Sequence, residues 1–167
     1  MDEQQRALQR FRQLSPLDLY ELEGLWVGRH IPTGHPFDGV LENLGWFGKR
    51  FTPDLRADAL LFRTGDRRLR AIDPKWIPLG LALRLHAFGR TGLARSLFSW
   101  GQCAFQAKAP VASVKTLTFE GVASAAMIYD RQPIIDHFRK VNDNRIMGLM
   151  VIRNDDRLFA FELERVT

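Results

Sequence analysis

With 167 residues, 46% of them hydrophobic and 26% charged, the chain can bury the core of one domain and is not a disordered protein. The absence of a long apolar run, the charged start MDEQQRALQR and the single Cys103 exclude a membrane span, a secretory signal and an internal disulfide, and predict a cytoplasmic protein. The net charge of +5 is unevenly distributed, because the segment from Lys49 to Lys108 contains 12 Lys and Arg and only 4 Asp. Solvated loops and helix faces explain this excess of positive charge, and a binding site for an anion is the alternative.

The first elements in chain order are predicted to be helical. Apolar residues recur at helical spacing over residues 3–14, which predicts an N-terminal helix. Ser15-Pro16 then has the pattern of a helix start, so a second, short helix is expected to end near Glu23. After Glu23 the apolar period changes to two, which predicts a strand over residues 25–30.

The middle of the chain combines strands with helices. Alternating apolar residues predict three strands, over residues 46–52, 59–63 and 67–72. A hairpin turn at residues 64–66 is expected to join the second strand to the third. Residues 76–88 and 93–107 break this alternation. They carry broad apolar faces at helical spacing, which predicts two helices.

The C-terminal part is predicted to contain two hairpins with a helix between them. The hairpins pair 114–119 with 122–129, and 146–153 with 158–166. Between the hairpins, Ile134, Phe138 and Val141 recur on one helical face that begins after Pro133. This spacing predicts a helix over residues 133–141.

The segment Gly24-Leu25-Trp26-Val27-Gly28 places one indole between two glycines on the same face of the first strand. We expect Gly24 and Gly28 to leave space for the ring. Arg165, in the last predicted strand, falls on the inward face and is expected to cover the ring as a cation–π partner. We therefore predict that Gly24, Trp26, Gly28 and Arg165 have a structural role, pinning the first and last strands together at one end of a barrel.

A Gly-x-Trp in the first strand with an Arg near the chain end is similar to the calycin arrangement of lipocalins and fatty-acid-binding proteins. The chain more closely resembles the bacterial GXWXG family joined to its uncharacterised C-terminal companion domain. Three segments carry this resemblance: GLWVG from Gly24, HPFDGVLENLGWFGKRF from His35, and GVASAAMIYDRQPIIDHFRKVNDNRIMGLM from Gly121. The resemblance implies a fold neighbourhood and a bacterial origin, and no activity. The family pattern has an Asp where this chain has Val151.

These observations predict a mainly β protein: an antiparallel, calycin-like β-barrel with an N-terminal helix and a helical insertion that covers the barrel. We expect a single domain over residues 1–167. Its parts are an N-terminal helical segment (1–23), a GXWXG half (24–73), the helical insertion (74–108) and a C-terminal half (109–167).

Large and pliable side chains favour an apolar cavity inside the barrel, although the same residues can fill a solid core. Lys49 lies between two phenylalanines on one strand face, where a desolvated ammonium needs an anionic partner. The acid group of a ligand is one such partner, and a lysine that reaches the barrel rim is the alternative. The predicted ligand-binding residues are Lys49, Phe47, Phe51, Met127 and Met147.

Tyr129, Asp136 and His137 are the candidate catalytic residues, because a carboxylate beside an imidazole can act as general acid and base. The alternative is that Asp136 and His137 occupy the polar side of the predicted helix. The His and Cys residues do not have metal-binding spacing, and the sequence contains neither a phosphate-binding glycine loop nor a GxSxG elbow. We therefore predict no metal and no cofactor.

The leading functional hypothesis is that the barrel cavity binds a small, largely apolar or amphipathic ligand, with an acidic group favoured. An enzyme that uses the same pocket for acid–base chemistry of the isomerase or cyclase type is the alternative. A third hypothesis is a peripheral module that applies the basic, amphipathic residues 76–107 to an anionic membrane surface. Because we expect these helices to pack onto the barrel, we predict little membrane contact, and we expect no nucleic-acid partner.

Overall fold

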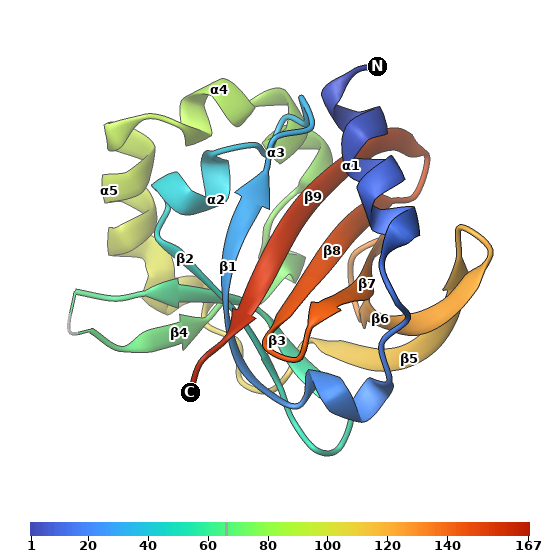
Figure 1. The fold of residues 1–167 in the computed structure, drawn as a ribbon. Coiled ribbons are helices and arrows are strands. Elements are labelled where there is room, and N and C mark those ends of the chain that lie inside the picture. Colours follow the sequence, from blue (N-terminus) through green and yellow to red (C-terminus); the bar gives the residue numbers. More distant parts are fainter. Residues whose placement is uncertain (66) are drawn as a thin grey trace.

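The computed structural model describes residues 1–65 and 67–167 and contains a closed antiparallel β-barrel (Figure 1). The barrel strands are β1 (Gly24–Ile31), β2 (Trp46–Phe51), β3 (Arg56–Arg63), β5 (Ala112–Phe119), β6 (Val122–Tyr129), β7 (Ile134–Asn142), β8 (Arg145–Ile152) and β9 (Asp155–Arg165). They follow one another in the order β2-β1-β9-β8-β7-β6-β5-β3, and pairing of β2 with β3 closes the ring. The extra strand β4 (Leu69–Ala71) pairs with β3. The predicted mainly β barrel is confirmed.

Most strand pairs join neighbours in the chain, and β9 then returns to pair with β1, where Trp26 lies opposite Arg165. Alternation along β9 separates an apolar inner face from a polar outer face. Phe159 and Phe161 belong to the buried core, whereas Glu162 forms ion pairs with side chains outside the barrel. This period of two is the pattern expected for a barrel with a filled interior.

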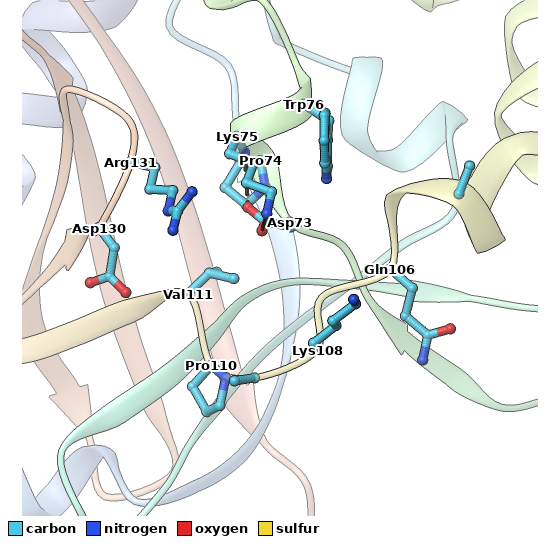
Figure 2. Close-up of a pocket in the computed structure, with 12 residues that line it drawn as sticks. Asp73, Pro74, Lys75, Trp76, Gln106, Lys108, Pro110, Val111, Asp130 and Arg131 are labelled. Carbon is cyan, nitrogen blue, oxygen red and sulfur yellow. Dashed lines mark hydrogen bonds and ion pairs between the residues drawn. The ribbon is translucent and has the colours of Figure 1, made fainter.

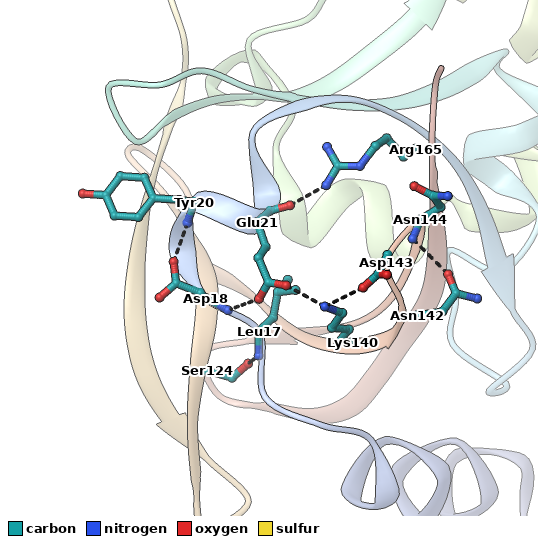
Figure 3. Close-up of polar contacts among 10 residues, drawn as sticks. All are labelled: Leu17, Asp18, Tyr20, Glu21, Ser124, Lys140, Asn142, Asp143, Asn144 and Arg165. Carbon is teal, nitrogen blue, oxygen red and sulfur yellow. Dashed lines mark hydrogen bonds and ion pairs between the residues drawn. The ribbon is translucent and has the colours of Figure 1, made fainter.

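One end of the barrel is closed by the 3-10 helix η1 (Leu19–Leu22) and the side chains around it (Figure 3). The indole of Trp26 is fully buried, and its Nε1 donates a hydrogen bond to the Leu22 carbonyl at 2.7 Å. The Arg165 guanidinium carbon lies 4.3 Å from the centroid of the Trp26 ring. Arg165 also donates to the carbonyls of Glu21 and Glu23 at 2.7 and 2.6 Å. The predicted contact between Trp26 and Arg165 is therefore present, and we call this part of the barrel the closed end.

The two motif glycines, Gly24 and Gly28, leave space for the side chains of Arg165 and Trp46 and not for Trp26. A Cβ on Gly28 would lie 2.3 Å from Cη2 of Trp46, and a Cβ on Gly24 would lie 3.2 Å from Nη1 of Arg165. The expectation that both glycines make room for the Trp26 ring was therefore wrong. Barrel closure brings β2 and the end of β9 against β1, and these contacts cannot be read from the spacing within β1 itself.

The short helix before β1 begins later than predicted. Its N-cap is Asp18, whose side chain accepts hydrogen bonds from the η1 backbone, while Glu21 caps the backbone of Asp18 in return. Ser15 instead forms a β-bridge with Lys140, and Lys140 also forms an ion pair with Glu21 (Figure 3). The backbone bond to β7 therefore holds Ser15 in an extended conformation, and the predicted helix start at this residue was wrong.

Residues 133–141, predicted as a helix, form the strand β7. Ile134 and Phe138 are four residues apart, a spacing that places them on one face of a helix and equally on one face of a strand. Pairing with β6 and β8 satisfies the β7 backbone and decides between the two structures. As a consequence Asp136 faces the barrel interior together with Ile134 and Phe138, whereas His137 faces outwards.

Short helices cover the other end of the barrel, which we call the covered end (Figure 1). They are α2 (Val40–Asn43) in the loop after β1, followed in the insertion of residues 74–108 by η2 (Pro74–Trp76), α3 (Leu79–Arg84), α4 (His86–Gly89), α5 (Gly92–Gly101) and η3 (Gln102–Phe105). The insertion is thus helical as predicted, in shorter pieces than expected. Among the described residues, no helix combines the length and the apolar character needed to cross a bilayer.

The N-terminal helix α1 (Glu3–Gln13) lies outside the barrel against β8 and β9. Its buried Ala7 and Phe11 form a second, smaller apolar cluster with Met147, Leu149 and Ala160. The main core lies inside the barrel. The turn predicted at 64–66 includes residue 66, which lies outside the described residues.

Candidate ligand cavity

An apolar cavity of about 140 Å³ lies at the covered end, between α2, α3 and the interior of the barrel. Its wall combines inward side chains of the barrel, among them Phe159 and Phe161, with Leu41 of α2 and Leu79 of α3. Four residues supply charged or amide groups and a phenol to this otherwise hydrophobic wall: Lys49, Tyr129, Gln132 and Asp136.

Three of these polar residues form one buried cluster. The ammonium Nζ of Lys49 lies 2.9 Å from Oδ2 of Asp136, donates to the Ala59 carbonyl at 2.9 Å, and lies 3.4 Å from the Tyr129 hydroxyl. Lys49 and Asp136 are 3% and 1% exposed, and Tyr129 is also buried. The anionic partner that Lys49 needs is therefore a residue of the chain itself.

An irregularity in β2 directs Lys49 into the barrel. The pairing of β2 with β3 shifts on both sides of Gly48, so that Trp46 and Lys49, three residues apart, both line the cavity. A Cβ on Gly48 would lie 1.9 Å from the Trp26 carbonyl oxygen, so β1 and β2 approach closely where a side chain is missing. The sequence alternation that placed Phe47 on the same face as Lys49 does not hold across this bulge.

Burial changes the acid–base properties of the cluster. Desolvation raises the pKa of Asp136 above its ordinary value, although the neighbouring Lys49 ammonium and Tyr129 act in the opposite direction. Desolvation also raises the pKa of Tyr129, and the Asp136 carboxylate adds to this effect, so Tyr129 keeps its proton.

The Asp136 carboxylate retains hydrogen-bonding capacity. Lys49 contacts Oδ2 at ion-pair distance, and hydrogen bonding from Lys49 and Tyr129 acts to lower the carboxyl pKa, but Oδ1 has no hydrogen-bond partner among the residues that the structure describes. A buried carboxylate oxygen that lacks a donor is costly in an apolar wall, so a donor from a bound molecule would stabilise Oδ1 of Asp136.

Of the five residues predicted to bind a ligand, Lys49 lies in the cavity wall. Phe51 and Met127 are buried in the main core without lining the cavity, and Met147 packs under α1 outside the barrel. The Phe47 ring lies 5.1 Å from the Arg63 guanidinium carbon and does not line the cavity. The predicted group is therefore dispersed over four environments.

The candidate catalytic residues separate into two places. Asp136 and Tyr129 share the cavity, whereas His137 stacks on Phe119, with the ring centroids 4.1 Å apart. Burial, with a smaller effect of Arg139, lowers the pKa of His137 to about 4. Neighbours in a strand point to opposite faces, so Asp136 and His137 do not form the acid–base pair that the sequence suggested.

One polar lining residue, Gln132, was missed from the sequence. Gln132 precedes β7, and its Nε2 donates to the carbonyls of Pro74 and Ile77 at 2.7 and 3.0 Å, which ties the insertion to the barrel. Met150 lines the cavity from β8. A strand assignment for residues 134–142 would have predicted inward positions nearby, but the hydrogen bonds of Gln132 depend on tertiary contact.

A larger, open groove of about 490 Å³ lies outside the barrel beside the insertion (Figure 2). Its carboxylates are already paired, Asp73 with Lys75 at 3.3 Å and Asp130 with Arg56 at 2.5 Å. Exposed ion pairs of this kind carry little free hydrogen-bonding demand. We therefore place the candidate site in the internal cavity. Within the described residues, no three His, Cys, Asp or Glu side chains are grouped to hold a metal ion.

Comparison with protein families divides the chain in two. Residues 9–66 match the family model described as GXWXG protein, and residues 110–165 match the model described as domain of unknown function, DUF4334. The two matches confirm the resemblance found in the sequence. Lys49 belongs to the GXWXG region and Asp136 to the DUF4334 region, so the buried cluster is assembled from both.

A crystal structure of a protein from Thermomonospora curvata has a similar fold, with a TM-score of 0.71 at 26% sequence identity; the match covers 98% of this chain and 87% of that one. No curated protein matches the sequence. Val151, where the resemblance led us to expect an Asp, is half-buried and follows Met150, which lines the cavity, so its side chain lies on the outer face of β8. An Asp at that position would not reach the Lys49–Asp136 pair.

Proposed function

We propose that the barrel cavity binds a small, largely apolar molecule whose hydroxyl or other hydrogen-bond donor contacts Asp136. The observation that carries this proposal is the Asp136 carboxylate, 1% exposed, whose Oδ1 has no hydrogen-bond partner among the described residues and which lies in an otherwise apolar wall. Apolar walls with a few convergent polar groups are typical of small-molecule sites.

The size of the cavity restricts the ligand. At about 140 Å³ it is close to an engineered protein cavity of about 150 Å³ that binds benzene. A six-membered ring with one substituent is therefore the largest rigid ligand expected without movement of α2 or α3. A longer ligand would have to displace these short helices.

The ion pair changes the expected charge of the ligand. Lys49 was expected to need an anionic partner, for which the acid group of a ligand was one candidate, but Asp136 already supplies the opposite charge at 2.9 Å. A ligand carboxylate would meet Asp136 as a like charge in a poorly solvated site. We therefore expect a neutral donor to bind better than an acid.

Phenol and toluene test the proposal because they have nearly the same shape and differ in one hydroxyl. In the wild type, the affinity ratio of phenol to toluene is expected to exceed that of the double variant Lys49→Met/Asp136→Leu by about tenfold or more, the effect of a hydrogen bond to a charged group. Replacing both partners of a buried ion pair with apolar residues is often tolerated, so the double variant is expected to fold. Calorimetry or ligand-observed NMR measures the four affinities.

The matched control is Arg50→Met/Asp58→Leu, which removes an ion pair between β2 and β3 on the outside of the barrel. It is expected to keep the wild-type ratio. A ratio unchanged in the Lys49/Asp136 variant, or no binding of either compound to the wild type, contradicts the proposal.

Benzoate supplies the test of charge: it is expected to bind the wild type more weakly than phenol and to gain affinity in Asp136→Asn, where Lys49 loses its counter-charge.

A second function, acid–base catalysis in the same cavity, is favoured by the raised pKa of Asp136 and by the two donors beside it, Lys49 and Tyr129. Asp136 would remove a proton from the carbon next to a carbonyl, while Lys49 or Tyr129 donates to the carbonyl oxygen. Hydrogen–deuterium exchange of cyclohexanone in D₂O tests this step. The wild type is expected to accelerate the exchange and Asp136→Asn to lose the acceleration; equal rates with and without the protein contradict catalysis.

A further inference from the structure

The insertion exposes most of the large apolar side chains on the surface of the protein. Among the described residues, eight of the eleven exposed large hydrophobic side chains lie between residues 76 and 105. They are Trp76, Leu81, Leu85, Phe88, Leu93, Leu97, Trp100 and Phe105. Single exposed apolar residues are ordinary, but a concentration of this kind in one short segment marks an interaction surface.

The geometry of α5 shows why these side chains remain outside. Ala94 is buried and Phe98 packs edge-on against Phe62 of β3, with the ring centroids 4.7 Å apart, so one face of the helix is already satisfied by the barrel. Leu97 and Trp100, three residues apart, share a neighbouring face of the helix and are 54% and 88% exposed. The helix therefore has two apolar faces, and the barrel covers one of them.

The charged side chains of the insertion itself are all basic, and one of them, Lys75, is paired with Asp73 just before the insertion. The sequence contains no Asp or Glu from residue 74 to residue 119, whereas the insertion carries exposed cations. These are Lys75, Arg84, Arg90, Arg95 and Lys108. Arg90 and Arg95 donate to backbone carbonyls of the loop around α2, and their charges are not paired with a carboxylate among the described residues. An apolar surface with a positive rim is complementary to an anionic and hydrophobic partner.

We propose that the outer face of the insertion docks on an anionic phospholipid surface. The apolar side chains would enter the headgroup–acyl boundary, and the cations would contact the lipid charges. A second copy of this chain is a poorer partner, because it would bring the same unpaired cations against one another. The sequence led us to expect little membrane contact, since it predicted that the insertion packs its apolar faces onto the barrel; the exposed second face of α5 removes that reason.

The docking surface and the cavity share α3. Leu79 and Ala82 line the cavity, whereas Leu81 and Leu85 are about half exposed on the outside. Docking would therefore place the cover of the cavity next to lipid, where small apolar molecules partition. The docking proposal does not rest on ligand binding in the cavity, because vesicle binding is measured with the cavity empty.

Co-sedimentation with vesicles tests the proposal. The full chain is expected to bind vesicles that contain phosphatidylglycerol and not vesicles of phosphatidylcholine alone, and added salt is expected to weaken the binding. Leu97→Ser/Trp100→Ser is expected to lose at least about tenfold in vesicle affinity, and Arg84→Gln about fivefold. The matched controls, Tyr20→Ser and Lys115→Gln, remove an exposed aromatic residue and a cation outside the insertion and are expected to bind like the wild type.

Three results would overturn the proposal. One is no binding to the anionic vesicles. Another is equal binding to neutral vesicles that salt does not weaken, which indicates nonspecific adsorption. The third is that the wild type does not bind vesicles but self-associates in sedimentation equilibrium, and that Leu97→Ser/Trp100→Ser abolishes this self-association. That result would assign the surface to a second copy of the chain.

Discussion

At the closed end of the barrel, η1 and Arg165 enclose the fully buried Trp26, whereas at the covered end short helices enclose an apolar cavity. The closed end is held by directed contacts: Arg165 donates to two carbonyls, and Lys140 forms an ion pair with Glu21. At the covered end, the helices touch the barrel on one side and present apolar side chains to solvent on the other. A tryptophan therefore has different surroundings at the two ends: Trp26 is fully buried at the closed end, whereas Trp100 is 88% exposed at the covered end.

The largest expected effect tests this comparison directly. Trp26→Ala is expected to lower the free energy of unfolding by about 3–5 kcal/mol, because it removes a fully buried indole and its contacts with Arg165 and Leu22. Trp100→Ala at the covered end is the control and is expected to stay within about 0.5 kcal/mol of the wild type. Urea unfolding measures both. Similar losses for the two variants would show that the ends do not differ in this way.

A change in β1, Gly28→Ala, sharpens the role of the motif. The new methyl group would lie within 2.3–2.8 Å of ring atoms of Trp46, which is buried against Phe161 and cannot easily move. We expect a loss of about 1–3 kcal/mol in the free energy of unfolding. Gly28→Ala/Trp46→Leu is expected to recover part of the loss. If the second substitution recovers nothing, the glycine is not required for the indole.

Acid is expected to loosen the covered end through His35, which packs between Phe37 and Phe159. Burial, followed by the charge of Arg157, lowers the pKa of His35 to about 4 from 6.5. The folded state therefore binds the proton less tightly than the unfolded state, so stability is fully present above pH 6.5 and is lost as the pH falls towards 4. After allowance for solvent screening, we expect a loss of about 2 kcal/mol from this residue.

Thermal unfolding of His35→Phe over the same pH range measures this contribution. The variant is expected to lose less stability than the wild type between pH 6.5 and 4. A residual loss is expected because the pKa of the outward-facing His137 is also lowered to about 4. Parallel pH profiles for the variant and the wild type would contradict the assignment.

The smallest effect is expected to have the opposite sign. Gly80 lies in α3, and a Cβ there would meet no atom within 4 Å. Gly80→Ala is expected to stabilise the protein by about 0.4–1 kcal/mol, because alanine restricts the unfolded chain and favours the helix. Thermal unfolding measures the change. A destabilisation would indicate that Gly80 is needed for close contact at the covered end.

The sequence predicted the barrel well where one pattern dominates. Alternation in β9 and in the hairpin of β5 and β6 was sufficient because these strands pair with chain neighbours, and the contact of Trp26 with Arg165 followed from their faces. It failed in β7, where Ile134 and Phe138 fit both periods, and the helix assigned there turned Asp136 away from the interior. It also failed in β2, because a bulge at Gly48 is not visible in alternation.

The amino-acid sequence by itself determined the barrel class and the helical nature of the insertion. It also placed Trp26 in the first strand and Arg165 in the last strand, on faces that allow them to meet. Only the tertiary structure decided that Lys49 and Asp136 neutralise each other inside the cavity, and that α5 leaves Leu97 and Trp100 uncovered. The reason is physical. Local periodicity specifies which face a residue occupies, but charge partners and covered faces depend on which distant strands and helices come into contact, and the closing of the barrel sets those contacts.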